Sequence, residues 1–245
     1  MSPWTGRCAP CATLVALTVL WIAAEAGASG WVVVGPVQVL ETCQQTARGP
    51  IFTDPQGHAW SLVVDPADAA IANPGSGRFW PAPTAWVEEA LAALDPELGA
   101  RVGGRIVILP FPRRELTCSS CDGWSIYLSP GVQPLSRETV HFLLFHEVGH
   151  LIHRQLLPDW DAAGWREYLH ARGIDDLRRH HHAAQLGDQP HEVFAEDFRR
   201  LFGSPEARAL EPLSPSSAPA LEPRALAVRA FFVDLLELGL GAGAP

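Results

Sequence analysis

One stretch of the chain, residues 139–152, constrains the fold more than any other. It is almost wholly apolar, and Glu147 is its only acidic or basic residue besides histidines. A buried charge is costly unless a metal ion or another partner stabilises it, so this carboxylate indicates a functional site. Ser136 is a favourable N-cap and Pro158 follows the apolar pattern, which predicts a helix over residues 137–156.

The motif His146-Glu147-Val148-Gly149-His150 lies within this predicted helix. Residues four apart differ by about 40° around a helix axis, so His146 and His150 project together and can bind one ion. Glu147 is rotated by about 100° from His146 and reaches the water on the open side of that ion. Zinc lowers the pKa of its water, and the carboxylate accepts the proton during attack on a carbonyl. The motif therefore predicts a hydrolytic zinc centre with Glu147 as the general base.

A catalytic zinc ion requires a third protein ligand. The pattern HExxHxxGxxH does not supply it, because His153 occupies the Gly position and Leu156 occupies the final His position. His153 lies only three residues after His150 on the same helix, which is too close to complete a tetrahedral set of ligands easily. It is therefore expected to be a supporting or surface residue. A downstream helix offers Glu192 and Glu196, one turn apart on a single face. Spacing alone leaves either of them as the ligand, or makes the two an ordinary solvated pair with a salt bridge to Arg199.

HEVGH, followed about forty residues later by ExFAExF, resembles the catalytic domain of anthrax lethal factor and the Pro-Pro endopeptidases, within the Glu-ligand zincins. The resemblance covers roughly residues 106–202 and is carried by the two helices. It implies that Glu192 is the third zinc ligand and that Glu196 is a supporting residue. It also implies that an edge strand before the metal helix binds extended substrate. The residues in that position are Trp124, Ile126, Tyr127 and Leu128.

The chain departs from this family at the residue that stabilises the oxyanion. The family has a Tyr seven residues before the ligand Glu, and this chain has Gln185 there. The candidates for the role are Tyr168, Gln185 itself and His182, the last from the run His180–His182. That run, considered alone, is more typical of a solvated or adventitious metal-binding segment.

The remaining patterns predict an α+β domain of zincin-like type, with a small mixed sheet over the metal helix and a mainly helical C-terminal part. This metallopeptidase domain is expected over residues 81–240, and residues 29–80 are either part of it or a removable pro-segment. Asp188 is expected to cap the helix that carries the two glutamates. Strands are expected over residues 31–34, 37–40, 60–64, 105–109 and 124–128, and helices over residues 84–94, 164–171, 192–202 and 224–238.

Residues 1–28 have the pattern of an export signal. Arg7 precedes an uncharged apolar run, and Ala26-Gly27-Ala28 is a suitable cleavage site. An uncleaved membrane anchor is the alternative, but the run is shorter than the ~20 residues that a spanning helix needs. The signal predicts a protein that is secreted or held in the periplasm or cell envelope, without stable membrane association after cleavage. In such an oxidising compartment, one disulfide is expected among Cys43, Cys118 and Cys121.

Charge helps to define the partners. The net charge is −9 and no basic run with interleaved aromatic residues occurs, which argues against nucleic acid as a partner. The predicted function is therefore zinc-dependent hydrolysis of a protein or peptide substrate. Two alternatives without catalysis are a protein that binds zinc but is inactive, and a binding module that has the zincin fold and uses it only to bind a partner. The presence of Glu147 argues against the inactive zinc protein, in which a general base would have no role.

Overall fold

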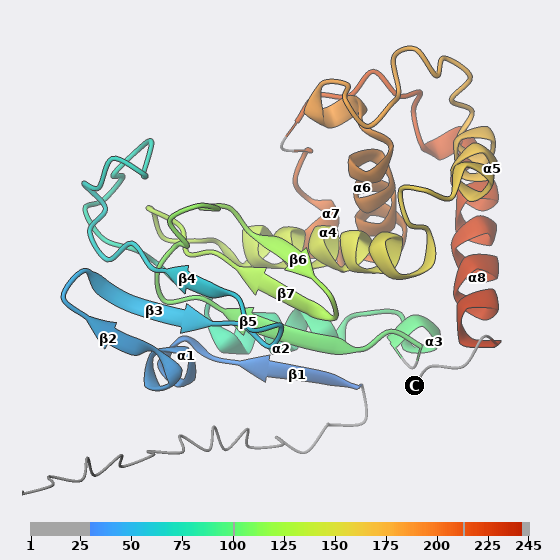
Figure 1. The fold of residues 1–245 in the computed structure, drawn as a ribbon. Helices are drawn as coiled ribbons and strands as arrows, with labels where there is room; N and C mark the ends of the chain where they lie inside the picture. The colour runs from blue at the N-terminus through green and yellow to red at the C-terminus, as the bar shows by residue number, and fades with distance from the viewer. Residues whose placement is uncertain (1–29, 100, 213, 242–245) are drawn as a thin grey trace, which may run out of the picture.

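The computed structural model describes residues 30–99, 101–212 and 214–241, and its core is a four-stranded sheet with the order β1-β5-β7-β6 (Figure 1). Strands β1, β5 and β7 are parallel, whereas β6 lies antiparallel to β7 at one edge. The predicted export signal, residues 1–28, lies outside the described residues. The strands are β1 (Trp31–Val34), β5 (Gly104–Ile108), β6 (Ser120–Asp122) and β7 (Ser125–Leu128).

A small antiparallel sheet packs against one face of this central sheet. It consists of β2 (Gln44–Thr46), β3 (Gly49–Thr53) and β4 (Ala59–Ser61). Phe52 joins Val107 and Tyr127 in the apolar cluster between the two sheets. Strand β1 belongs to the central sheet, and strands β2–β4 cover that sheet. Much of the segment 29–80 therefore packs with the later strands as part of one fold.

The expected strand over residues 37–40 is wrong, because that segment lies within helix α1 (Pro36–Thr42). Its alternation of apolar and polar residues resembles a strand, but Pro36 occupies the first turn of a helix. The Gln38 side chain also accepts a hydrogen bond from the backbone N–H of Gly35 at 2.8 Å, which closes that turn.

Helices α2 (Thr84–Ala92) and α4 (Arg137–Leu156) belong to the apolar cluster on the other face of the sheet. The predicted bounds of α4 are confirmed, and Ser136 accepts a hydrogen bond from the backbone N–H of Thr139 at 3.1 Å. Figure 1 shows α4 running behind β7 and β6 toward the helices of the C-terminal part. The helix therefore connects the strands to the helical half of the molecule.

The helical half forms around Phe232, which is fully buried on α8 (Ala225–Gly241). Its ring contacts those of Phe194 and Phe198, which come from α6 (Pro190–Phe202). The other helical segments are α3 (Pro96–Gly99), α5 (Ala162–Arg172), α7 (Pro205–Arg208), η1 (Leu186–Asp188) and η2 (Glu222–Arg224). Among the described residues, no helix has both the length and the apolar character needed to cross a membrane. The fold is thus α+β, as expected.

The expected cap of α6 is wrong. Gln189 is the N-cap residue, and Pro190 follows in the first turn. The Asp188 carboxylate instead accepts hydrogen bonds from the backbone N–H and the hydroxyl of Ser217, at 2.5 and 2.8 Å. These bonds lower the pKa of Asp188 to about 2, although burial opposes the shift. Asp188 therefore fastens the loop before α8 to the start of α6.

Candidate metal centre

His146, His150 and Glu192 bring three ligand atoms together where α4 crosses α6. The two histidine Nε2 atoms are 3.1 Å apart, and the carboxylate oxygens of Glu192 lie 3.3 Å from His146 Nε2 and 3.5 Å from His150 Nε2. A tetrahedral zinc ion with bonds of 2.0–2.1 Å separates its ligand atoms by about 3.3 Å. The three side chains therefore fit a zinc ion in both chemistry and spacing.

The crossing of the two helices depends on Gly149. A Cβ atom added at this position would lie 2.7 Å from the Cα of Ala195, so only glycine lets α6 approach this closely. Glu192 lies one turn before Ala195 on α6 and is thereby held against the two histidines. Val193, Phe194 and Phe198 are buried in the main apolar cluster and fix the rotation of α6.

Substitution of Gly149 by alanine is expected to destabilise the protein by about 1–3 kcal/mol and to weaken zinc binding without changing a ligand. Alanine inside an exposed helix normally stabilises by about 1 kcal/mol relative to glycine, but here the added methyl meets backbone atoms of α6. Thermal unfolding in chelator and zinc affinity by competition are the measurements. Gly164→Ala is the control, since its methyl would meet only the side chains of Leu157 and Asp161. Unchanged zinc affinity in Gly149→Ala would contradict the role of this crossing.

The protonation states of His150 and Glu192 suit metal binding. Burial lowers the pKa of His150 to about 4, so its imidazole is neutral near pH 7 and keeps a lone pair. Burial alone would raise the pKa of Glu192, but its contacts with His146 and His150 outweigh burial and hold that pKa below its ordinary value. A neutral imidazole and an ionised carboxylate are the forms that bind a divalent cation.

Glu147 faces the same cavity as the three ligands, which has a volume of about 940 Å³. The side chain is only 6% exposed, and burial raises the pKa of Glu147 to about 7. A carboxylate with a pKa near neutrality is well matched to accepting and returning a proton. No described residue forms a hydrogen bond or an ion pair with this carboxylate, and the charges of His146, Arg154 and Arg113 only partly oppose the effect of burial.

Two roles were expected for Glu196, either support of the zinc site or a salt bridge to Arg199, and its contacts combine features of both. Its Oε2 atom is 4.0 Å from His146 Nδ1, which is close to the imidazole but beyond hydrogen-bond distance. The same oxygen accepts a 2.9 Å hydrogen bond from Nε of Arg199, whose side chain is fully buried. Arg200 donates to the other carboxylate oxygen at 2.9 Å. Glu196 is therefore held in a salt bridge beside the candidate metal centre.

The edge strand next to the cavity is β6 and not the segment expected from sequence. Strand β7, with Ile126, Tyr127 and Leu128, is buried between β5 and β6, and Trp124 lies in the turn before it. Ser120 and Cys121 of β6 line the cavity instead. The pattern missed β6 because a strand of three residues, Ser120–Asp122, is too short to show strand periodicity. Cys43, Cys118 and Cys121 are free thiols, so the expected disulfide is not formed in this structure.

The three expected oxyanion stabilisers do not line the cavity in the described part of the chain. The Tyr168 prediction is wrong, because this side chain is fully buried and its hydroxyl donates to Asp197 at 2.9 Å. Arg172 donates to the same carboxylate at 2.6 Å, so Asp197 is also engaged away from the metal ligands. Gln185 is exposed, and His182 is exposed beside His191.

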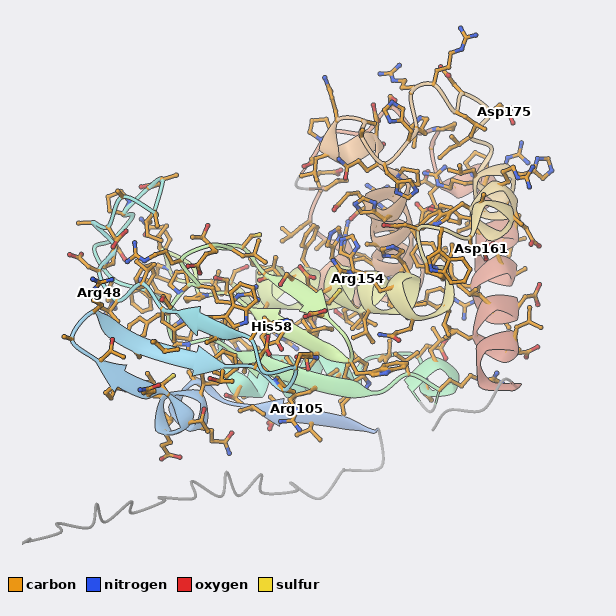
Figure 2. All side chains as sticks on the ribbon, in the orientation of Figure 1. Arg48, His58, Arg105, Arg154, Asp161 and Asp175 are labelled. Atoms are coloured by element: carbon orange, nitrogen blue, oxygen red, sulfur yellow. The ribbon has the colours of Figure 1, made fainter. Side chains whose placement is uncertain are left out.

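Sequence reasoning assigned no role to several other cavity residues. Arg154, Asp159 and His191 all line the same space as the ligands. Figure 2 shows Arg154 at the end of α4, between β6 and the helical half. For His191 a signal was available, since it directly precedes Glu192 on the helix that carries the ligand. Asp159 follows Pro158 in a loop, where no periodicity marks it.

Comparisons with protein-family models, curated proteins and solved structures gave no match to this chain. Its function is therefore argued from the residues of the site.

Proposed function

We propose that this protein is a zinc-dependent peptidase of zincin-like fold. The observation that carries the proposal is the spacing of the candidate ligand atoms. The Nε2 atoms of His146 and His150 are 3.1 Å apart, one carboxylate oxygen of Glu192 lies 3.3 Å from the first, and the other lies 3.5 Å from the second. The buried carboxylate of Glu147 beside them completes the constellation. The predicted export signal assigns the reaction to the cell exterior, periplasm or envelope.

Each residue has a defined task in this proposal. A bound zinc ion supplies Lewis acidity that activates water toward a carbonyl carbon. His146, His150 and Glu192 would hold the ion beside the cavity that they line. Glu147 accepts a proton on its carboxylate as the carbonyl is attacked and returns it to the leaving amine. Its pKa of about 7 suits both transfers.

The free edge of β6 supports a peptide substrate over a small molecule. A strand at the edge of a sheet has unpaired backbone N–H and C=O groups, which can pair with an extended peptide. Ser120 and Cys121 of this strand line the same cavity as Glu147. A peptide added along β6 would therefore lie over the catalytic carboxylate.

A non-catalytic zinc protein is the second candidate, and one observation favours it. Tyr168, Gln185 and His182 are absent from the described cavity wall, so none of the expected oxyanion stabilisers is in place. Glu147 favours the peptidase, because burial of this carboxylate serves no structural contact among the described residues.

Cleavage of a broad peptide library by the purified protein is expected to require zinc. Treatment with a chelator should abolish cleavage, because it removes the Lewis acid, and stoichiometric zinc should restore it. Mass spectrometry of the products is the measurement. Cleavage that survives chelation would refute the metal mechanism. A zinc-loaded protein that cleaves nothing would favour the non-catalytic alternative.

A further inference from the structure

A row of imidazoles extends away from the candidate metal centre, from the cavity wall to the exposed His182. The rings of His153 and His191 are stacked, with centroids 5.6 Å apart and planes at 16°. The rings of His191 and His182 are also stacked, at 5.9 Å and 12°. His150 lies 5.9 Å from His191, so the row begins at a ligand of the first centre. Asp159 adds a carboxylate to it.

We propose that Asp159, His182 and His191 form a second binding site for a divalent transition-metal ion of the zinc type. Each offers one ligand atom, and these atoms all lie within 4.8 Å of one another. His182 Nδ1 is 3.7 Å from Asp159 Oδ1, close to the ~3.3 Å spacing that a tetrahedral zinc ion gives its ligands. Two imidazoles and one carboxylate suit zinc, nickel or copper better than magnesium or calcium.

The surroundings of these residues support a ligand role. His153 is 5% exposed, and its Nε2 atom lies 3.1 Å from Asp159 Oδ1, so a buried imidazole orients the carboxylate. Such a supporting partner is typical of metal ligands. His191 Nε2 lies 3.7 Å from Glu192 Oε1, and its other nitrogen, Nδ1, is buried without a hydrogen-bond partner among the described residues. A ligand role for this nitrogen would give it a partner, as buried polar atoms usually have.

The second site is expected to be weaker than the first. Asp159 and His182 are exposed, so both side chains must lose rotational freedom when the ion binds. Asp159 lies two residues before Asp161, the N-cap residue of α5, which Figure 2 labels on the helical side of the molecule. The two sites are joined through neighbouring residues of α6, because His191 would bind the second ion and Glu192 the first. This inference concerns metal binding and does not depend on peptidase activity.

Titration of the metal-free full-length protein with zinc, in competition with a chromophoric chelator, tests the proposal. Two ions per chain are expected, one tight and one weak. Asp159→Asn and His182→Gln should each weaken the second ion by at least ~10-fold, the loss that follows even from removing a supporting residue, and leave the tight ion unchanged. Glu192→Ala should have the opposite effect, losing the tight ion and keeping the weak one.

His181→Gln is the matched control, because His181 is an exposed neighbour in the same histidine run and is not part of the cluster. It should bind both ions normally. Binding of a single ion, or equal loss of the second ion in His181→Gln and His182→Gln, would overturn the proposal. The second outcome would identify an adventitious histidine run.

Discussion

Alanine at Glu192 is expected to produce a protein that loses its zinc ion during dialysis. The substitution leaves two histidines, His146 and His150, at a site that needs three protein ligands. Removal of the carboxylate also removes the negative charge that lies 3.3 and 3.5 Å from their Nε2 atoms. Zinc content after dialysis against a weak chelator is the measurement, and it should fall from one tightly bound ion per chain to near zero.

Glu196→Gln is the matched control for this experiment. It removes a charge from the same helix, one turn away, and its amide oxygen can still accept one of the two hydrogen bonds that Arg199 donates to the carboxylate. Alanine at this position is a poorer control, because it removes the carboxylate that contacts the fully buried Arg199 and leaves this charge with the backbone carbonyls of Ala207 and Leu210, which costs about 3–5 kcal/mol. Glu196→Gln should keep its zinc. If Glu196→Gln is the metal-free protein and Glu192→Ala stays loaded, the assignment of the ligand is reversed.

Replacement of Glu147 by glutamine is expected to lower kcat/KM by at least ~10²-fold while zinc content is unchanged. Glu147 is not a ligand in the proposed centre, so the amide leaves His146, His150 and Glu192 in place. It removes the group that accepts and returns the proton. Glu138→Gln, in the half-buried first turn of the same helix, should leave activity unaltered. Normal turnover by a zinc-loaded Glu147→Gln protein would remove this residue from the mechanism.

The same variant has a separate effect on stability. Burial raises the pKa of Glu147 from 4.5 to about 7 in the folded chain. A raised pKa means that ionisation destabilises the fold, so the penalty appears as the pH rises above 4.5 and is complete above about 7. In chelator at pH 8, Glu147→Gln should therefore be more stable than the parent, by on the order of 3 kcal/mol. A residue that costs stability and supports activity is typical of a catalytic site.

Local signals allowed α4 to be predicted in full. Ser136 caps its start, Pro158 lies just beyond its end, and the apolar pattern between them gave the bounds that the structure has. The face shared by Glu192 and Glu196 was also predictable, because it depends only on helical geometry. These features could be inferred because each is determined by residues within one or two turns of each other.

The missed features depend on contacts between distant segments. The order of strands in a sheet depends on how the strands pair with one another and cannot be inferred from the residues of one strand. For this reason β6 was not predicted to be the edge strand beside the cavity. Tyr168 had the right chemistry for an oxyanion stabiliser, but packing turned it toward Asp197. Asp159, His182 and His191 become neighbours only when α4, α6 and the loop before α6 have packed together.

The crossing of α4 and α6 has a thermodynamic consequence. A metal ion that binds His146, His150 and Glu192 together binds only chains in which these two helices have docked, so its binding free energy adds to the stability of the docked state. Each tenfold excess of free zinc over its dissociation constant adds about 1.4 kcal/mol. Zinc supply would then determine how often the helices around Phe232 separate from the sheet, and therefore how long the chain resists proteolysis.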